Sequence, residues 1–211
     1  EKLCKLIGCK YGVFAPNGTL SLYLGLKAIG IKPGDEVIVP DFTFIASANA
    51  VEMIGAKPIF ADIDLKTLHI DINKCKELIT TKTKAIMPVH IYGTSANMDS
   101  VMKFANKYNL KVIEDAAQAI GVKWKGKHCG SFGDVGSFSF FADKTITTGE
   151  GGFVCTNDEK IYKNLLYLRN QGRIDRGSFK HPEIGYNFRI TDIQCAVGLA
   201  QLKKLDIIIE K

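Results

Sequence analysis

A lysine lies in the middle of the most distinctive stretch of this 211-residue sequence, SFSFFADKTITTGEGG at residues 137–152. Ser137 to Phe141 has the serine and aromatic content of a strand, and a loop with three glycines within four residues follows Lys144. A lysine amine has an ordinary pKa of about 10.4, so it becomes a nucleophile near neutral pH only where burial or a neighbouring cation favours its neutral form. Taken alone, Lys144 is better interpreted as a surface charge at a strand end, because the chain has 24 lysines, so the case depends on its neighbours.

An acidic residue follows a second apolar run. Asp115 comes directly after Lys111–Glu114 and before two alanines. A carboxylate at the carboxyl end of a buried strand is costly unless a cation or a proton donor meets it. Asp115 also suits the start of a helix at Ala116, so a ligand-binding role and a capping role are both open.

A third candidate is the turn Asn17-Gly18-Thr19, which joins an apolar segment at 11–15 to an apolar helix predicted at 20–29. A helix N-terminus after such a turn presents free backbone N–H groups and the positive end of a dipole, which together bind phosphate. The same residues are an ordinary helix N-cap, so this turn does not decide by itself.

The three candidates together match one cofactor. Pyridoxal phosphate requires a helix N-terminus for its phosphate, an acid for its pyridinium nitrogen and a lysine for its aldehyde. The order of the three groups and their places at strand ends therefore predict a pyridoxal phosphate site.

Strand and helix patterns alternate along the chain at the spacing of βαβ units. Strands are predicted at 11–15, 36–40, 57–61, 84–90, 110–113, 137–141 and 152–156, and helices at 20–29, 41–54, from 71, 97–108, 158–168 and from 191 to at least 205. The fold class expected is α/β, with a three-layer, mainly parallel sheet and helices on both faces. Ligands of such sheets bind at the carboxyl ends of the strands.

Composition excludes other classes of protein. The formal charge of +6 is scattered along the chain without a cluster of basic and aromatic residues, so no nucleic acid is expected as a partner. The six cysteines form no C-x-x-C pair and have no histidine at zinc spacing, so no metal is expected. No signal peptide and no long apolar run is present, which predicts a cytoplasmic protein without a membrane partner.

The four histidines are not expected to form a site. His69, His128 and His181 lie in polar segments, where exposure is expected, and His90 is expected to be a paired histidine at a strand end. Residues 171–182 are polar and rich in turn residues, which predicts a surface loop or lid.

Several motifs also resemble a known family. They are Asn17-Gly18-Thr19, GDEVIVPDFTFIASANA at 34–50, EDAAQAIG at 114–121, SFSFFADKTITTGEGG at 137–152 and GYNFRITDIQCAVGLAQL at 185–202. They are similar to those of the DegT/DnrJ/StrS nucleotide-sugar aminotransferases, a group of fold-type I pyridoxal phosphate enzymes, and the resemblance spans essentially the whole chain. It implies that residues 1–211 are the large, cofactor-binding domain, with an N-terminal helix incomplete at Glu1 and a smaller C-terminal domain missing.

The resemblance also implies roles for single residues. Lys144 would be the catalytic Schiff-base lysine and would move the proton between substrate and cofactor. Asp115 would pair with the pyridinium nitrogen, and Gln118 would lie near the phenolic oxygen of the cofactor.

The remaining cofactor-binding residues follow from the same resemblance. Gly18, Thr19 and Ser139 would hold the phosphate, and Phe44 would stack on the ring. Asn187 matches a residue that the family contributes to the phosphate of the neighbouring subunit, which implies a homodimer with shared active sites.

The reaction implied is the transfer of an amino group from an amino acid, usually glutamate, to a keto group of a nucleotide-linked 6-deoxyhexose. Its biological setting would be the biosynthesis of surface polysaccharide, such as O-antigen, or of another glycoconjugate. The KTITTGEGG and GYNFR segments resemble members that act on the 4-keto position, such as perosamine synthases. The sugar, the nucleotide and the carbon are left open by the sequence.

Three alternatives were weighed. A pyridoxal phosphate enzyme with another outcome, a sugar dehydratase or a desulfurase, is disfavoured because dehydratase relatives carry histidine in place of Lys144 and no cysteine lies in a suitable loop. A catalytically incompetent fragment that only binds the cofactor or only oligomerises is the second. A dinucleotide-binding protein is excluded because no G-x-G-x-x-G opens a helix after a strand.

Overall fold

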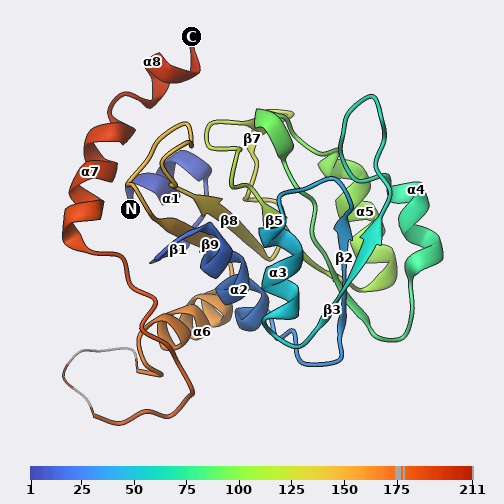
Figure 1. The fold of residues 1–211 in the computed structure, drawn as a ribbon, viewed down its shortest axis with the longest axis horizontal. Coiled ribbons are helices and arrows are strands. Elements are labelled where there is room, and N and C mark those ends of the chain that lie inside the picture. Colours follow the sequence, from blue (N-terminus) through green and yellow to red (C-terminus); the bar gives the residue numbers. More distant parts are fainter. Residues whose placement is uncertain (174–176, 178, 211) are drawn as a thin grey trace.

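The computed structural model describes residues 1–173, 177 and 179–210, and a seven-stranded sheet forms its centre (Figure 1). The strands, in sheet order, are β1 (Tyr11–Ala15), β9 (Gly152–Thr156), β8 (Val135–Ser139), β5 (Lys111–Asp115), β4 (Thr83–Ile86), β2 (Glu36–Pro40) and β3 (Lys57–Ala61). β9 pairs antiparallel with both of its neighbours, and every other neighbouring pair is parallel. Strands β6 (Lys123–Trp124) and β7 (Lys127–His128) form a separate hairpin.

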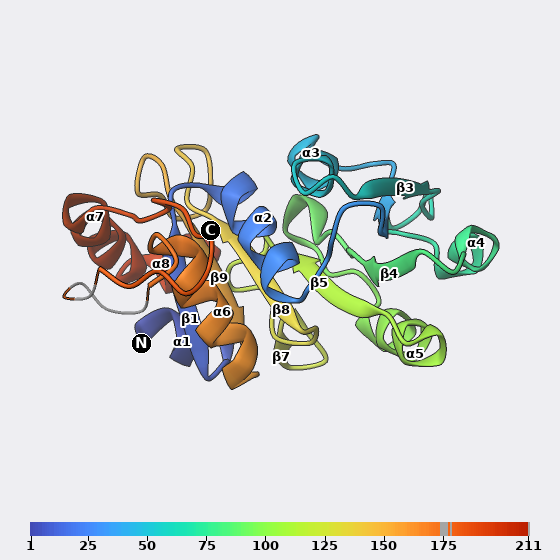
Figure 2. The same cartoon turned by 90° about the horizontal axis from the view of Figure 1, so that it is seen from below.

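Helices cover both faces of the sheet (Figure 2). The α-helices are α1 (Lys2–Ile7), α2 (Gly18–Ala28), α3 (Ala46–Glu52), α4 (Ile72–Cys75), α5 (Met98–Tyr108), α6 (Glu159–Arg169), α7 (Asp192–Leu202) and α8 (Leu205–Ile209), and the 3-10 helices are η1 (Lys76–Leu78) and η2 (Ile91–Gly93). Helices α2, α3 and α6 pack on one face. Helix α5 covers part of the other face, and α1 and α8 cover the rest.

The alternation of side chains along each strand builds these two interfaces. In β2, Val37 and Val39 pack toward α2 and α3, whereas Ile38 packs toward α5. In β9, Val154 joins the α2 side, whereas Phe153 joins the α1 side. Apolar side chains of β2 and β9 therefore pack into cores on both faces of the sheet. The three-layer, mainly parallel α/β architecture predicted from the sequence is confirmed.

The direction of the strands places their following loops at one edge. Strands β1, β2, β4, β5 and β8 all run the same way, so the segments after them emerge at the same edge of the sheet. This edge receives residues from four distant parts of the sequence, and it is the edge where open α/β sheets bind ligands.

Some local predictions were wrong. The helix predicted at 41–54 is restricted to Ala46–Glu52 because residues 41–45 form bends and a turn. The sequence of the last helix has an apolar stripe that favours burial, made of Ile193, Ala196, Val197, Ala200 and Leu202, but no residue of α7 is buried, and Ile193 is 80% exposed. That helix also ends at Leu202, and α8 begins separately at Leu205.

Two histidine predictions were wrong for a common reason. His69 and His128, expected at the surface, are buried. The ring of His69 bonds to the carbonyl of Val89 and the hydroxyl of Thr94, and that of His128 accepts the Gly121 N–H, so each polar ring is satisfied inside the protein. Burial lowers the pKa of both imidazoles.

The predicted loop at 171–182 lies partly outside the described residues, because 174–176 and 178 are not among them. Among the residues that are described, no helix has both the length and the apolar character needed to cross a membrane. In that same part of the chain, no three acidic, histidine or cysteine side chains gather as metal ligands do.

Candidate active site

Gly18 and Ser139 meet where β1 and β8 end. A side-chain carbon added to Gly18 would lie 2.8 Å from Cβ and 3.0 Å from Oγ of Ser139, closer than such atoms approach in proteins. The absence of a side chain at position 18 is therefore what lets the turn after β1 approach the end of β8. Two of the three residues predicted to hold the phosphate are thus brought together, although they are far apart in the sequence.

The N-terminus of α2 has donors to spare beside this contact. Asn17 caps the helix by accepting the Leu20 N–H at 2.9 Å. Within the described residues, the N–H groups of Gly18 and Thr19 donate to no protein acceptor. Two free N–H groups at the positive end of an 11-residue helix, next to the Ser139 hydroxyl, form an anion-binding arrangement.

Asp115 ends β5 and is 5% exposed. Its Oδ2 accepts the hydroxyl of Ser47 at 2.6 Å, and its Oδ1 accepts the Ala117 N–H at 3.2 Å. Burial raises the pKa of the carboxyl, whereas the Ser47 bond and the nearby cation of Lys144 lower it. A buried acid of this kind is stabilised as an anion when a positively charged donor reaches it.

Lys144 lies in the loop between β8 and β9. Phe140 fixes the base of this loop: its N–H donates to Gly151 and its carbonyl accepts the Thr148 N–H. The Lys144 side chain is 20% exposed, and its amine lies 3.2 Å from the exposed carboxylate of Asp143. The loop therefore has a fixed base and presents the lysine on the same edge as Asp115, close enough for its charge to act on that carboxyl.

Gln118 and Phe44 lie on the loops that follow β5 and β2. The side-chain oxygen of Gln118 accepts the Tyr92 N–H at 2.6 Å, and Tyr92 has a left-handed backbone with φ 53°. Phe44 is 71% exposed, and its neighbour Phe42 makes an edge contact with the Tyr92 ring. Phe42 and Tyr92 therefore pack against each other at this part of the edge, whereas the Phe44 ring is open to solvent.

Asn187 is the predicted site residue that does not join this group. Its neighbours Tyr186 and Phe188 both pack on Tyr23 of α2, and the two tyrosine hydroxyls are 2.7 Å apart. Because side chains alternate along an extended segment, Asn187 points away from this contact, and it is exposed. The structure leaves it on the outer surface rather than beside Gly18 and Ser139.

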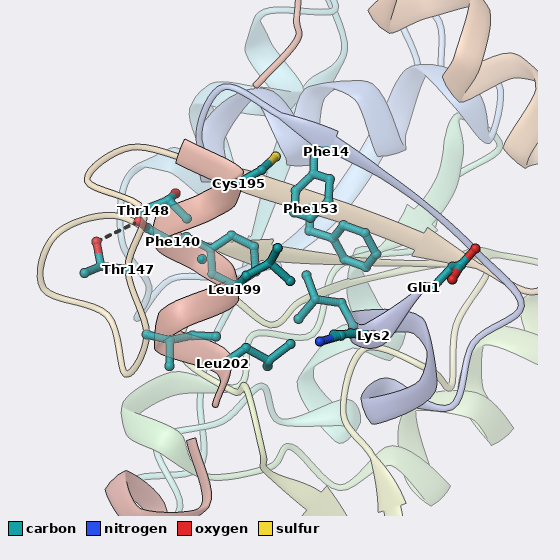
Figure 3. Close-up of a pocket in the computed structure, with 13 residues that line it drawn as sticks. Glu1, Lys2, Phe14, Phe140, Thr147, Thr148, Phe153, Cys195, Leu199 and Leu202 are labelled. Atoms are coloured by element: carbon teal, nitrogen blue, oxygen red, sulfur yellow. Dashed lines mark hydrogen bonds between the residues drawn. The ribbon is translucent and has the colours of Figure 1, made fainter. Parts of the chain in front are cut away.

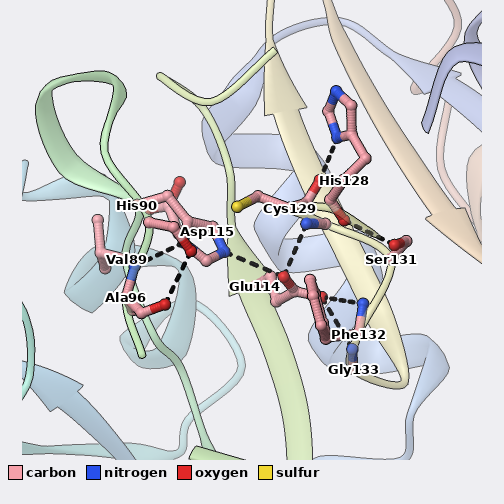
Figure 4. A network of polar contacts seen from close by, with 12 residues as sticks. Val89, His90, Ala96, Glu114, Asp115, His128, Cys129, Ser131, Phe132 and Gly133 are labelled. Carbon is pink, nitrogen blue, oxygen red and sulfur yellow. Dashed lines mark hydrogen bonds and ion pairs between the residues drawn. The ribbon is translucent and has the colours of Figure 1, made fainter. Parts of the chain in front are cut away.

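A network of polar contacts surrounds the carboxylate of Glu114, the neighbour of Asp115 in β5 (Figure 4). The carboxylate of Glu114 accepts the backbone N–H groups of Gly130, Phe132 and Gly133 at 2.7 to 2.8 Å. The Nε2 of His90 lies 3.0 Å from the same carboxylate, and its Nδ1 accepts the Ala96 N–H, which assigns the ring proton to Nε2. His90 is thus the paired strand-end histidine that the sequence predicted.

A separate apolar cavity of about 340 Å³ lies behind the Lys144 loop, under α7 (Figure 3). Its lining includes Phe14 of β1, Phe153 of β9 and Leu199 of α7. None of the predicted site residues lines it, so it is distinct from the edge that holds Lys144 and Asp115.

The chain matches the model of the DegT/DnrJ/EryC1/StrS aminotransferase family over residues 1–211. It belongs to this family. The resemblance identified from the motifs is thereby confirmed.

Relatives of known name support the same assignment. The chain is 50% identical over 199 residues to a GDP-perosamine synthase of Caulobacter vibrioides and 49% identical over 202 residues to one of Escherichia coli O157:H7, covering 94% and 96% of this chain. It is 45% identical over 201 residues to a UDP-N-acetyl-3-dehydro-alpha-D-glucosamine 3-aminotransferase of Acidithiobacillus ferrooxidans, covering 95% of this chain. The chain spans about half the length of these relatives, from 54% to 56%.

Solved structures have the same fold. An aminotransferase of Psychrobacter cryohalolentis superposes with a TM-score of 0.91 at 40% identity, over 96% of this chain and 54% of that one. NtdA of Bacillus subtilis, solved with its cofactor PMP, superposes with a TM-score of 0.91 at 36% identity, over 97% and 47% of the two chains. Aminotransferases of this family depend on pyridoxal phosphate.

The residues at the edge fit this cofactor. A phosphate suits the N–H groups of Gly18 and Thr19, which have no acceptor among the described residues and lie beside Ser139. The buried Asp115 suits a protonated ring nitrogen, since its burial raises its pKa unless a cation pairs with it. Lys144, on the same edge, suits the aldehyde.

Ser47 and Thr43 are functional candidates that sequence reasoning missed. Ser47 bonds to Asp115, and Thr43 bonds to Ser47. Their spacing of four residues, directly after β2, was a usable signal: on a helical turn it places both hydroxyls on one side, at the ligand edge.

Proposed function

We propose that this chain forms the cofactor-binding part of an aminotransferase that moves an amino group from an amino acid to the keto group of a nucleotide-linked 6-deoxyhexose. The observation that carries the proposal is the placement of Lys144 and Asp115 on one sheet edge, beside the Gly18 and Ser139 contact. Family membership and the two perosamine synthase relatives support it.

Each predicted residue then has a physical task. The N–H groups of Gly18 and Thr19 and the Ser139 hydroxyl bind the phosphate, where the helix dipole adds to the attraction. Asp115 holds a proton on the ring nitrogen through a charge-assisted hydrogen bond. Phe44 stacks on the ring and Gln118 orients the phenolic oxygen.

Lys144 carries the chemistry. Bound pyridoxal phosphate supplies an electrophilic carbon for amines and an electron sink for the electron pair left when a substrate C–H proton departs. The Lys144 amine would hold the aldehyde of the cofactor, and the same amine would accept and return the substrate proton as a general base and acid.

Glutamate is the donor to test first, and GDP-linked keto-sugars are the acceptors to test first, because the most similar relatives reported above are named for a GDP-sugar. UDP-linked 3-keto-sugars form the second group, motivated by the relative named as a 3-aminotransferase. Such a reaction belongs to the biosynthesis of surface polysaccharides, O-antigen included.

We infer a homodimer from the position of Asn187. Its side chain faces outward from the Tyr186 and Phe188 contact, where a second copy would receive it. Mixing an inactive Lys144→Ala chain with an inactive Asn187→Ala chain tests this, since one of the two shared sites in a mixed dimer is intact. Recovery of part of the activity is expected, and no recovery would contradict sharing.

The function itself is tested by visible spectroscopy. Purified protein loaded with pyridoxal phosphate is expected to show the yellow band of a lysine-linked cofactor, and glutamate is expected to bleach it. A keto-sugar nucleotide is then expected to restore the band and to yield an amino sugar. A stable band that glutamate does not alter would instead indicate a domain that binds the cofactor without catalysis.

A further inference from the structure

Two hydroxyl groups form a chain of hydrogen bonds that ends on Asp115. The Ser47 hydroxyl donates to Oδ2 of Asp115 at 2.6 Å, and the Thr43 hydroxyl oxygen lies 2.8 Å from that of Ser47. A serine hydroxyl has one proton, so Ser47 can donate to Asp115 only if Thr43 donates to Ser47. While the carboxyl is ionised, the chain of donors therefore has one direction, from Thr43 through Ser47 to Asp115.

Burial prevents water from replacing the Ser47 hydroxyl as the donor to Asp115. Ser47 has no exposed surface and Asp115 has 5%, so bulk water does not reach the bond between them. The remaining groups around the carboxyl are the Ala117 N–H, which donates to Oδ1, and the His90 ring and Lys144 amine, which act on the carboxyl without a bond to it. Ser47 is the side chain that donates directly to Asp115 within the described residues.

The Ser47 hydroxyl is not occupied with capping its own helix. Serine in a first helical turn commonly bonds to nearby backbone. Here it bonds across 68 positions of sequence to another strand, and the N-cap residue Ile45 makes no side-chain cap. The geometry thus assigns the hydroxyl to Asp115 rather than to the start of α3.

We propose that Ser47 and Thr43 are positioning residues that hold Asp115 ionised and aimed at the ring nitrogen of the cofactor, an inference that rests on the function proposed above. Neither residue touches the reacting atoms. The hydrogen-bonded series from Thr43 through Ser47 to Asp115 is called the relay below. Thr43 lies between Phe42 and Phe44 in the sequence, so the relay also connects the segment proposed to face the cofactor ring with the acid proposed to bind the ring nitrogen.

The first test uses the protein without cofactor and follows the Asp115 carboxyl by carbon NMR, with Asp115→Asn to assign its signal. Ser47→Ala is expected to raise the pKa of Asp115 by about one unit or more, as expected for the loss of a hydrogen bond to a charged group. Ser47→Thr keeps the hydroxyl and is expected to restore the value. Thr43→Val is expected to give a smaller rise, and Thr43→Ser none.

The matched control is Ser100→Ala on α5, which removes a half-buried serine hydroxyl that bonds to none of the described residues. Ser100→Ala is expected to leave the Asp115 signal unchanged. Thermal unfolding of every variant separates a local effect from a loss of fold. An unchanged pKa of Asp115 in folded Ser47→Ala, or equal changes in Ser47→Ala and Ser100→Ala, would overturn the relay.

The second test uses protein loaded with pyridoxal phosphate. Ser47→Ala is expected to weaken cofactor retention about tenfold or more, with Ser47→Thr close to wild type, because the acid is less often ionised when the ring nitrogen arrives. If no variant, wild type included, binds the cofactor, the proposed function fails while the NMR result still decides the relay. If all bind equally, the relay has no bearing on the cofactor and this inference fails alone.

Discussion

Glu114 and Asp115 are adjacent acids on opposite faces of β5, and both are buried. Glu114 accepts three backbone N–H groups and the His90 ring, whereas Asp115 accepts one hydroxyl and one N–H. A carboxylate can accept about four hydrogen bonds, so Glu114 is saturated by the protein and Asp115 is not. The difference separates an acid whose acceptor capacity is used within the fold from an acid that can accept further donors.

The largest effect is expected from removal of the Lys144 amine. Lys144→Ala is expected to abolish the visible band of the loaded protein and all amino transfer, because no other amine replaces the nucleophile. The fold is expected to survive, since the lysine side chain is bonded only to the exposed Asp143 among the described residues. Lys144→Arg is the control that keeps the charge without a nucleophilic amine. A normal band in either variant would contradict the role of Lys144.

The next largest effect concerns the unsaturated acid. Asp115→Asn keeps the shape but loses the charge, so the protein is expected to form the visible band, to release the cofactor more readily and to transfer amine at least about a hundredfold more slowly. Its free energy of unfolding is expected to be equal or higher at neutral pH, because a costly buried charge is removed. Near-normal turnover of Asp115→Asn would contradict the proposed role of Asp115.

Substitution of Glu114, the acid with all its acceptor positions used, is expected to lower stability without changing cofactor binding. Glu114→Gln places an NH₂ group against the backbone N–H donors and leaves His90 without its anion, so the free energy of unfolding is expected to fall by about 3 kcal/mol. Urea unfolding measures it. The fraction that remains folded is expected to bind cofactor as wild type does. A stable Glu114→Gln protein with weak cofactor binding would contradict the assignment of Glu114 to the fold and Asp115 to the cofactor.

The smallest effect is a pH dependence in the cofactor-free protein. Burial raises the pKa of Asp115 above its ordinary value of 3.8, so the native state holds this proton more tightly than the unfolded chain does. The unfolding free energy of wild type, relative to Asp115→Asn, is therefore expected to fall as pH rises from 3.8 through the raised native pKa. Denaturant titrations of both proteins across this range test it, and a constant difference would contradict the raised pKa.

The sequence was sufficient for the architecture and for most of the edge. Buried parallel strands and capped helices are local patterns, so β2, β3, α5 and α6 lie within a residue or two of their predicted places. Gly18, Asp115 and Lys144 were predicted to lie at one edge because each is at or after the end of a strand, and strands that run in one direction end at one edge.

What the sequence missed depends on contacts between distant segments. The polar neighbours of His69 predict exposure, but its ring is bonded to Val89 and Thr94. Ser47 looks like one small residue among others in an apolar helix until β5 places Asp115 beside it. The apolar face of α7 predicts burial, yet the described residues do not cover it.

The pairing of β1 with β9 has a consequence for how the protein is made. Tyr11 of β1 pairs with Thr156 of β9, so two strands that are about 140 residues apart in the sequence are neighbours in the sheet. Contacts that distant form slowly, because a long loop must close before they stabilise the chain. On a ribosome, Asp115 and Lys144 emerge before the turn at Gly18 can take its final position. Cofactor capture is therefore expected to begin only after nearly three quarters of this chain, up to Thr156 of 211 residues, has been synthesised.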